Sequence, residues 1–166
     1  MQSSLDIHPL VSVIVPSFNR SKTIGRTIES IINQQCNFPF EIIVGDDCST
    51  TEVVELLKDY QQKYPKIIRL LLHEKNVGLG ANWAMCVKQC KGKYIANCDD
   101  DDYWHNNEKL QLQVDYLEKN PDCGVCHTDF RNYYQKSGKY IEEKVSKLTY
   151  NEPLHKAIFH GKFRFC

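Results

Sequence analysis

Four consecutive acidic residues, 99–102, are the group in this sequence best suited to chemistry. They follow residues 93–97, an apolar-leaning run typical of a strand, so the carboxylates are expected to gather where a buried strand ends. Two like charges about 4 Å apart repel by roughly 4 kcal/mol at an effective dielectric near 20. A divalent cation would offset that repulsion, because Mg²⁺ takes carboxylate oxygens and often bridges them to substrate phosphates. A solvated acidic turn whose last residue, Asp102, caps the next helix explains the same residues. The cluster alone leaves both interpretations open.

The composition narrows the class of protein. A chain of 166 residues predicts one domain with a sizeable core. Its 21 basic and 21 acidic residues cancel, which argues against a nucleic-acid binder with a broad basic surface. No apolar run reaches 18 residues, and the first nine residues do not have the pattern of a secretory signal. We therefore expect a cytoplasmic protein with no transmembrane segment, whose eight cysteines are free thiols.

Strands and helices are predicted to alternate along the chain. Strands are predicted at residues 10–15, 40–44, 67–72, 93–98 and 123–130. Helices are predicted after a Ser21 cap, after a capping box at Ser49 and Glu52, and at residues 81–90 and 107–119. A hairpin is expected at residues 133–142. This order predicts an α/β fold with a mainly parallel sheet flanked by helices, in which ligands bind beyond the carboxyl ends of the strands.

Three predicted strand ends carry groups that suit one ligand. They are residues 16–18, residues 46–47 and the acidic segment 99–102. A helix is expected after each of them, and helix N-termini offer free N–H groups and partial positive charge to anions. Carboxylates for a metal and N–H groups for an anion at one crevice predict a metal-assisted nucleotide or phosphate site.

Segments 11–19, 40–50, 76–78 and 92–104 together resemble the family 2 glycosyltransferases, in order and at the usual spacing. The resemblance covers residues 10–130 and implies the Rossmann-like GT-A fold of nucleotide-diphospho-sugar transferases. It implies metal-dependent transfer of a sugar, with inversion, from a nucleotide-diphosphate donor such as a UDP-sugar to an acceptor hydroxyl. Residues 1–9 are then an N-terminal tail, and residues 131–166 are the start of an acceptor-side region. We expect that region to be incomplete and the chain to be truncated at its C-terminus.

The same resemblance assigns residues to the nucleotide base. Pro16, Ser17 and Phe18 are expected to line the base, with the Phe18 ring supplying the stacking face. Asp47 is expected to hydrogen-bond the uracil edge, with Asp46 beside it.

The resemblance also assigns the acidic segment. Asp101 is expected to be the direct ligand of Mg²⁺ or Mn²⁺, and Asp99 to contact the ribose or the metal. Asp100 stands between them, where relatives usually have a small residue, and is counted with the donor-binding residues. Many relatives carry an Arg after the Asn-x-Gly loop. This chain has none there, which leaves Lys75 as the candidate for a diphosphate contact.

The acceptor side is less defined. The family's general base is an Asp in the C-terminal half, and we expect it beyond residue 166. A saccharide or lipid-linked acceptor is implied, as are polysaccharide biosynthesis and peripheral association with the inner face of the membrane. A degenerate or truncated nucleotide-sugar-binding module without transfer activity fits the same residues.

Other motifs point elsewhere but weakly. Cys123, Cys126 and His127 have haem-attachment spacing, yet no export signal is present and positions three apart on a strand face opposite sides. Zinc is a second possibility for the same three residues, with Cys86, Cys90 or Cys98 as further ligands, but the sequence offers no second close pair of Cys or His. A phosphoryl-receiver domain would need an Asp at the end of the middle strand, where residues 72–73 are Leu and His.

Overall fold

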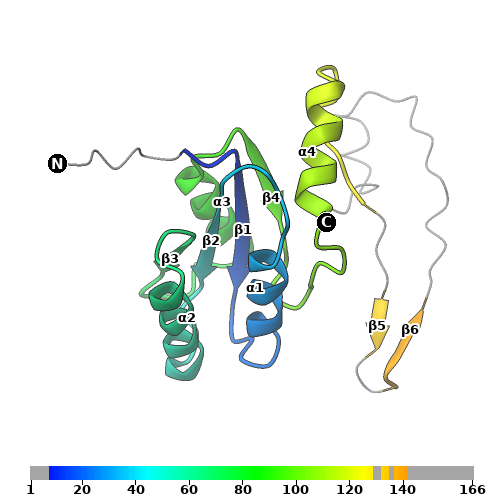
Figure 1. The fold of residues 1–166 in the computed structure, drawn as a ribbon. Coiled ribbons are helices and arrows are strands. Elements are labelled where there is room, and N and C mark those ends of the chain that lie inside the picture. Colours follow the sequence, from blue (N-terminus) through cyan, green and yellow to red (C-terminus); the bar gives the residue numbers. More distant parts are fainter. Residues whose placement is uncertain (1–7, 129–131, 135–136, 142–166) are drawn as a thin grey trace. The chain divides into compact units, whose positions relative to one another are not determined.

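A parallel four-stranded sheet forms the core of the N-terminal part of the chain (Figure 1). Its strands are β1 (Val11–Ser17), β2 (Phe40–Asp46), β3 (Ile68–Leu72) and β4 (Tyr94–Asn97), in the order β3-β2-β1-β4. The computed structural model describes residues 8–128, 132–134 and 137–141. Residues 1–124 and residues 125–166 form two compact units, and the sheet belongs to the first.

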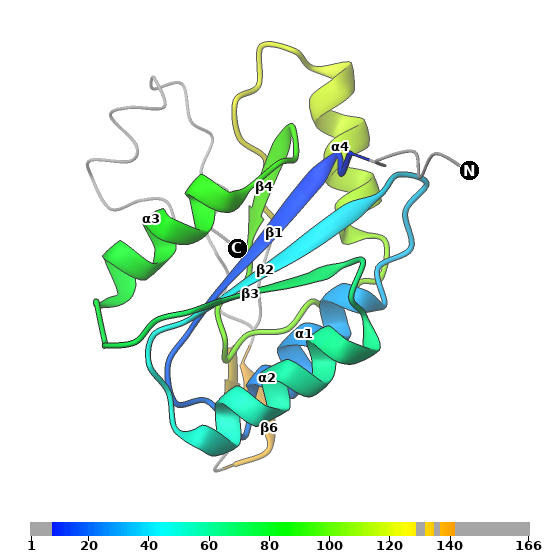
Figure 2. The ribbon, with the colours of Figure 1, turned by 90° about the vertical axis from the view of Figure 1, so that its left-hand side faces the viewer.

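Helices cover both faces of the sheet. Figure 2 shows α1 (Ile24–Ile32), α2 (Thr51–Lys63) and α4 (Lys109–Lys119) on one side and α3 (Leu79–Gln89) on the other. Every residue of β1 is buried, as expected for a parallel strand packed on two faces. Alternate β1 residues therefore enter different cores: Val13 packs in the core on the side of α1 and α2, and Ile14 packs with Cys86 of α3.

The strand register brings the strand ends together. Ser17, the last residue of β1, pairs with Asp46, the last residue of β2. Asp46 in turn pairs with Leu72 at the end of β3, and Ile14 of β1 pairs with Asn97 at the end of β4. The polar groups that follow these strands consequently share one edge of the sheet.

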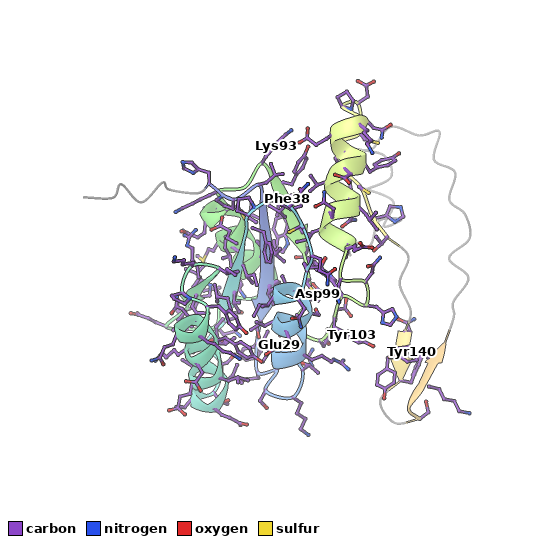
Figure 3. All side chains as sticks on the ribbon, in the orientation of Figure 1. Glu29, Phe38, Lys93, Asp99, Tyr103 and Tyr140 are labelled. Carbon is purple, nitrogen blue, oxygen red and sulfur yellow. The ribbon has the colours of Figure 1, made fainter. Side chains whose placement is uncertain are left out.

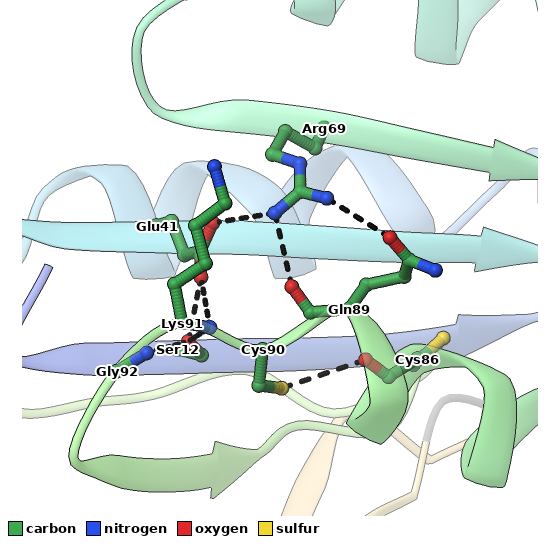
Figure 4. A network of polar contacts seen from close by, with 8 residues as sticks. All are labelled: Ser12, Glu41, Arg69, Cys86, Gln89, Cys90, Lys91 and Gly92. Carbon is green, nitrogen blue, oxygen red and sulfur yellow. Dashed lines mark hydrogen bonds and ion pairs between the residues drawn. The ribbon is translucent and has the colours of Figure 1, made fainter. Parts of the chain in front are cut away.

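A buried polar network ties together the opposite end of the sheet (Figure 4). The Glu41 carboxylate accepts hydrogen bonds from the Ser12 hydroxyl at 2.7 Å, the Lys91 backbone N–H at 2.8 Å and the Arg69 guanidinium at 3.0 Å. Burial raises the pKa of Glu41, but these hydrogen bonds outweigh it and the net shift is downward. This network connects β1, β2 and β3 to the turn between α3 and β4.

Most predicted elements are present, and the hairpin is confirmed. Antiparallel strands β5 (Asn132–Tyr134) and β6 (Lys139–Ile141) flank a turn with Gly138 at φ +64°. The strand predicted at 123–130 is wrong over residues 123–128, which have no regular structure. The Cys123 N–H donates instead to the Asn120 carbonyl, in a turn directly after α4. Residues 129–130 lie outside the described residues.

Both predicted helix caps are also wrong. Helix α1 begins at Ile24 after Thr23, and α2 begins at Thr51 after Thr50; neither has a side-chain cap hydrogen bond. The Ser49 hydroxyl accepts a hydrogen bond from the Asn19 N–H, a group 30 residues away. The Ser49 side chain, which local sequence predicted to cap α2, therefore makes a tertiary hydrogen bond instead.

Candidate functional site

The acidic segment lies against the loop that follows β1. The Phe18 N–H donates to Asp100 Oδ2 at 3.0 Å, which joins residues 82 positions apart in the sequence. The Thr27 hydroxyl of α1 donates to the carbonyl oxygens of Asp102, at 2.6 Å, and Asp100, at 3.2 Å. Figure 3 shows Asp99 on this segment, between β4 and α4. The structure thus brings the predicted Phe18 and Asp100 together.

Arg20 supplies positive charge that the sequence analysis did not assign. Its Nε lies 3.4 Å from Asp100 Oδ1, and its Nη2 lies 3.4 Å from Asp101 Oδ2. The Arg20 and Asp101 side chains are about half exposed, whereas the Asp100 side chain is 12% exposed. Burial raises the pKa of Asp100, and the hydrogen bonds from Phe18 and Ser17, followed by the charge of Arg20, partly oppose that shift. The one feature of the sequence that could have pointed to Arg20 is its position directly after residues 16–19, the segment assigned to the nucleotide base.

Asp99 is held by a different set of groups. The Asn97 amide donates to Asp99 Oδ1 at 2.9 Å, and the Trp83 indole N–H donates to Asn97 Oδ1 at 3.2 Å. Asp99 is therefore oriented from the side of α3, while Asp101 contacts Arg20 of the β1–α1 loop. The two acidic residues assigned to one metal motif, Asp99 and Asp101, are thus held by side chains from different parts of the fold.

Asp47 organises the loop that precedes α3. Its Oδ1 accepts the Val77 N–H at 2.7 Å and its Oδ2 accepts the Gly78 N–H at 2.9 Å. The Asn76 amide donates to the Asp47 carbonyl, and the Asp47 N–H donates to the Ser17 carbonyl. Each carboxylate oxygen has a second lone pair that these bonds do not use, and Asp47 as a whole is buried. The Asn-x-Gly loop is thus fixed to the predicted base-binding residue.

One buried oxygen beside Asp47 lacks a partner. Asp46 Oδ2 accepts the Ser49 N–H at 3.0 Å, but Asp46 Oδ1 has no hydrogen-bond partner, while the buried Ser17 hydroxyl lies beside the Asp100 carboxylate. Ser17 and Asp46 are register neighbours at the ends of β1 and β2. Pro16, one residue earlier, is buried within β1, whereas the Phe18 side chain is largely exposed.

The loops after β1 and β2 are joined by reciprocal hydrogen bonds. Besides the bond from Asn19 to Ser49, the Thr50 N–H donates to the Asn19 side-chain oxygen at 2.9 Å. Asn19 and Cys48 both have positive φ, +54° and +64°, a conformation that costs a non-glycine residue about 1–3 kcal/mol. Asn is among the residues that tolerate it best. The contacts between the two loops offset this cost.

A shallow hollow lies next to the Asp47 loop. It is lined by Leu72, His73, Glu74, Lys75 and Val77. Its position beside the end of β3 places the exposed Lys75, the predicted diphosphate contact, at the same sheet edge as Asp46.

The acidic segment fits a cation that is shared with a ligand. Within the described residues, no group of three or more His, Cys, Asp or Glu side chains is arranged as a closed metal site. Exposed carboxylates at Asp99 and Asp101 suit a hard cation that takes one or two protein oxygens and completes its shell with phosphate oxygens and water. None of the cysteines that the structure describes forms a disulfide.

The comparisons with known proteins identify the family. A family model described as glycosyl transferase family 2 matches residues 12–165. The chain belongs to glycosyl transferase family 2. It is 31% identical over 153 residues to the putative teichuronic acid biosynthesis glycosyltransferase TuaG of Bacillus subtilis, covering 90% of this chain and 59% of TuaG. It is 33% identical over 132 residues to an uncharacterized Mycobacterium tuberculosis protein, covering 80% of this chain and 38% of that protein.

Solved structures confirm the GT-A fold. Residues 1–349 of Staphylococcus aureus TarS, in complex with UDP-GlcNAc, match with a TM-score of 0.59 and 31% identity, over 67% of this chain and 32% of that one. The mannosyltransferase PcManGT of Pyrobaculum calidifontis, in complex with GDP-Man and Mn²⁺, matches with a TM-score of 0.59 over 66% of this chain and 32% of its own. Its 23% identity supports the fold alone. Among the described residues, no helix has both the length and the apolar character to cross a membrane.

Proposed function

We propose that this family 2 domain binds a UDP-sugar together with Mg²⁺ or Mn²⁺ and transfers the sugar, with inversion, to an acceptor hydroxyl. The observation that carries the proposal is the Phe18 N–H to Asp100 hydrogen bond, because it joins the predicted base-binding loop to the predicted metal motif. TarS, a relative by sequence as well as by fold, has been solved with UDP-GlcNAc, which supports a uridine nucleotide as donor.

The residues divide between the parts of the donor. The exposed Phe18 ring stacks on the base, and Asp47 accepts a hydrogen bond from the uracil edge at the free direction of a carboxylate oxygen. Asp46, which has one unpartnered oxygen, completes this end of the site with Ser17 and the buried Pro16.

Asp101 holds the cation, and Asp99, oriented by Asn97, contacts the ribose or the same cation. Asp100 remains the link to the Phe18 loop. When bound, the cation supplies positive charge that stabilises the departing diphosphate. In this family the general base lies in the C-terminal half of the catalytic domain. We also propose that residues 10–130 form the nucleotide-sugar-binding core and that the acceptor side begins at residue 131. A cytoplasmic location with a saccharide or lipid-linked acceptor is part of the same proposal.

Isothermal calorimetry of UDP with and without Mn²⁺ tests the assignment. We expect Asp101→Asn to reduce UDP affinity at least tenfold in Mn²⁺ and to leave metal-free binding within twofold of wild type. Asp59→Asn removes an exposed carboxylate on α2, away from this edge, and is the matched control. Unchanged Mn²⁺-dependent binding in Asp101→Asn would remove Asp101 from the metal site.

A further inference from the structure

Arg20 lies beside the Asp101 carboxylate, which the proposed cation needs. Its guanidinium bridges Asp100 Oδ1 and Asp101 Oδ2, at 3.4 Å from each. Asp101 is the proposed direct metal ligand, so the guanidinium and a divalent cation compete for the same carboxylate. Two cations at one carboxylate also repel each other, because like charges a few ångströms apart do so at any protein dielectric.

The contacts of Arg20 are loose enough to be exchanged. Charge-assisted N–H···O bonds usually span about 2.7–2.9 Å, shorter than both Arg20 contacts. The Arg20 and Asp101 side chains are each about half exposed, and such ion pairs contribute little to stability. The Asp100 carboxylate keeps its hydrogen bond from Phe18 without Arg20. Removing the guanidinium therefore leaves the acidic segment in place.

If the cation displaces the Arg20 guanidinium from Asp101, the diphosphate of the donor offers it a new anionic partner. A donor whose phosphates share a cation on Asp101 would bring negative charge to the neighbourhood of this carboxylate, which Arg20 contacts. The planar guanidinium matches phosphate geometry with paired N–H donors.

We propose that Arg20 is the counter-ion of this acidic segment before the metal arrives, and that it moves onto the donor diphosphate when the metal takes Asp101. This inference rests on the proposed function. Arg20 then lowers the affinity for the cation alone, because the two compete for Asp101. It raises the affinity for the nucleotide diphosphate once the cation is bound, because the displaced guanidinium contacts the phosphates.

The test is a pair of titrations on the whole chain. Mn²⁺ binding without nucleotide is measured by the electron paramagnetic resonance signal of free Mn²⁺, and UDP binding at saturating Mn²⁺ by calorimetry. We expect Arg20→Ala to tighten Mn²⁺ about three- to tenfold, since it removes the exposed ion pair to Asp101 and the contact to the more buried Asp100. We expect the same variant to weaken UDP about tenfold, since a charge-assisted contact to phosphate is lost. Arg20→Lys keeps the charge and should bind Mn²⁺ like wild type.

Arg26→Ala is the matched control. Arg26 lies on α1 with its guanidinium carbon 4.2 Å from the centre of the Tyr103 ring, and its charge acts on Asp102. The variant removes one positive charge near the same acidic segment and should change both affinities less than twofold.

The outcomes separate the possible failures. Mn²⁺ affinity that is unchanged or lower in Arg20→Ala, or shifts equal to those of Arg26→Ala, overturns the role of Arg20 while the proposed function stands. UDP affinity that is unchanged in Arg20→Ala overturns the transfer to the diphosphate. A wild-type chain that binds neither Mn²⁺ nor UDP overturns both this inference and the proposed function.

Discussion

The carboxylate of Asp47 is expected to control both the stability of the domain and the shape of the base-binding loop. Its two oxygens accept the N–H groups of Val77 and Gly78. Asp47→Asn replaces one acceptor oxygen with an N–H₂ group, so one backbone donor then faces another donor. Hydrogen bonds to charged groups contribute about 1.5–3 kcal/mol each. Losing one and weakening the other should cost about 2–4 kcal/mol in the free energy of unfolding.

Urea denaturation at pH 7 measures this loss. With a denaturant dependence of about 2 kcal/mol per molar urea, the midpoint should fall by about 1–2 M. The neighbouring Asp46 supplies a matched control, because one of its oxygens accepts the Ser49 N–H and the other is buried without a partner. Asp46→Asn keeps the acceptor that is used and removes a buried charge, so its midpoint should change by less than about 0.5 M. Equal losses in the two variants would refute the role assigned to the Val77 and Gly78 hydrogen bonds.

Two further variants test packing and charge away from the site. Glu41→Gln should cost about 1–3 kcal/mol at pH 7, because hydrogen bonds to a carboxylate weaken. Folding lowers the pKa of Glu41, so wild type should lose this stability as the pH falls below 4.5, the ordinary pKa of a Glu side chain, toward the lower pKa of the folded state. The variant, compared with wild type by urea unfolding at pH 7 and pH 3, should lose less stability over this range. Parallel pH curves for the two proteins would contradict the reasoning. Gly45→Ala should destabilise by about 1–3 kcal/mol, since a Cβ there overlaps the Asn82 and Cys86 side chains of α3. A Cβ at Gly80, within α3, meets no atom within 4 Å, so Gly80→Ala should be neutral or stabilising. Thermal unfolding of the two variants measures the difference, and equal shifts would contradict the packing argument.

The main parts of the fold follow from local sequence, for a physical reason. Apolar runs such as residues 10–15 and 40–44 can only be satisfied by strands buried on both faces, and the helices between them then have to cover the sheet. Local sequence was also enough to predict the hairpin, because glycine, here Gly138, readily adopts the positive φ that the turn requires.

Local sequence also determined which polar groups end the strands, and therefore which chemistry is available at the carboxyl edge. It did not determine the partners of those groups. Ser49 was predicted as a helix cap, but its hydroxyl receives the Asn19 N–H, because the register of β1 and β2 brings the two loops together. Residues 123–128 were predicted as a strand, but the chain turns after α4 and no pairing forms there among the described residues.

Only the tertiary structure decided how the acidic charges are balanced. Sequence reasoning called for a cation at residues 99–102, because four adjacent carboxylates repel. The fold places Arg20, about 80 residues earlier in the chain, on two of them, while Asn97 at the end of β4 contacts a third. Side-chain contacts across 80 residues depend on strand order and register, which no local pattern encodes, and so the group that competes for the metal ligand became visible only in three dimensions.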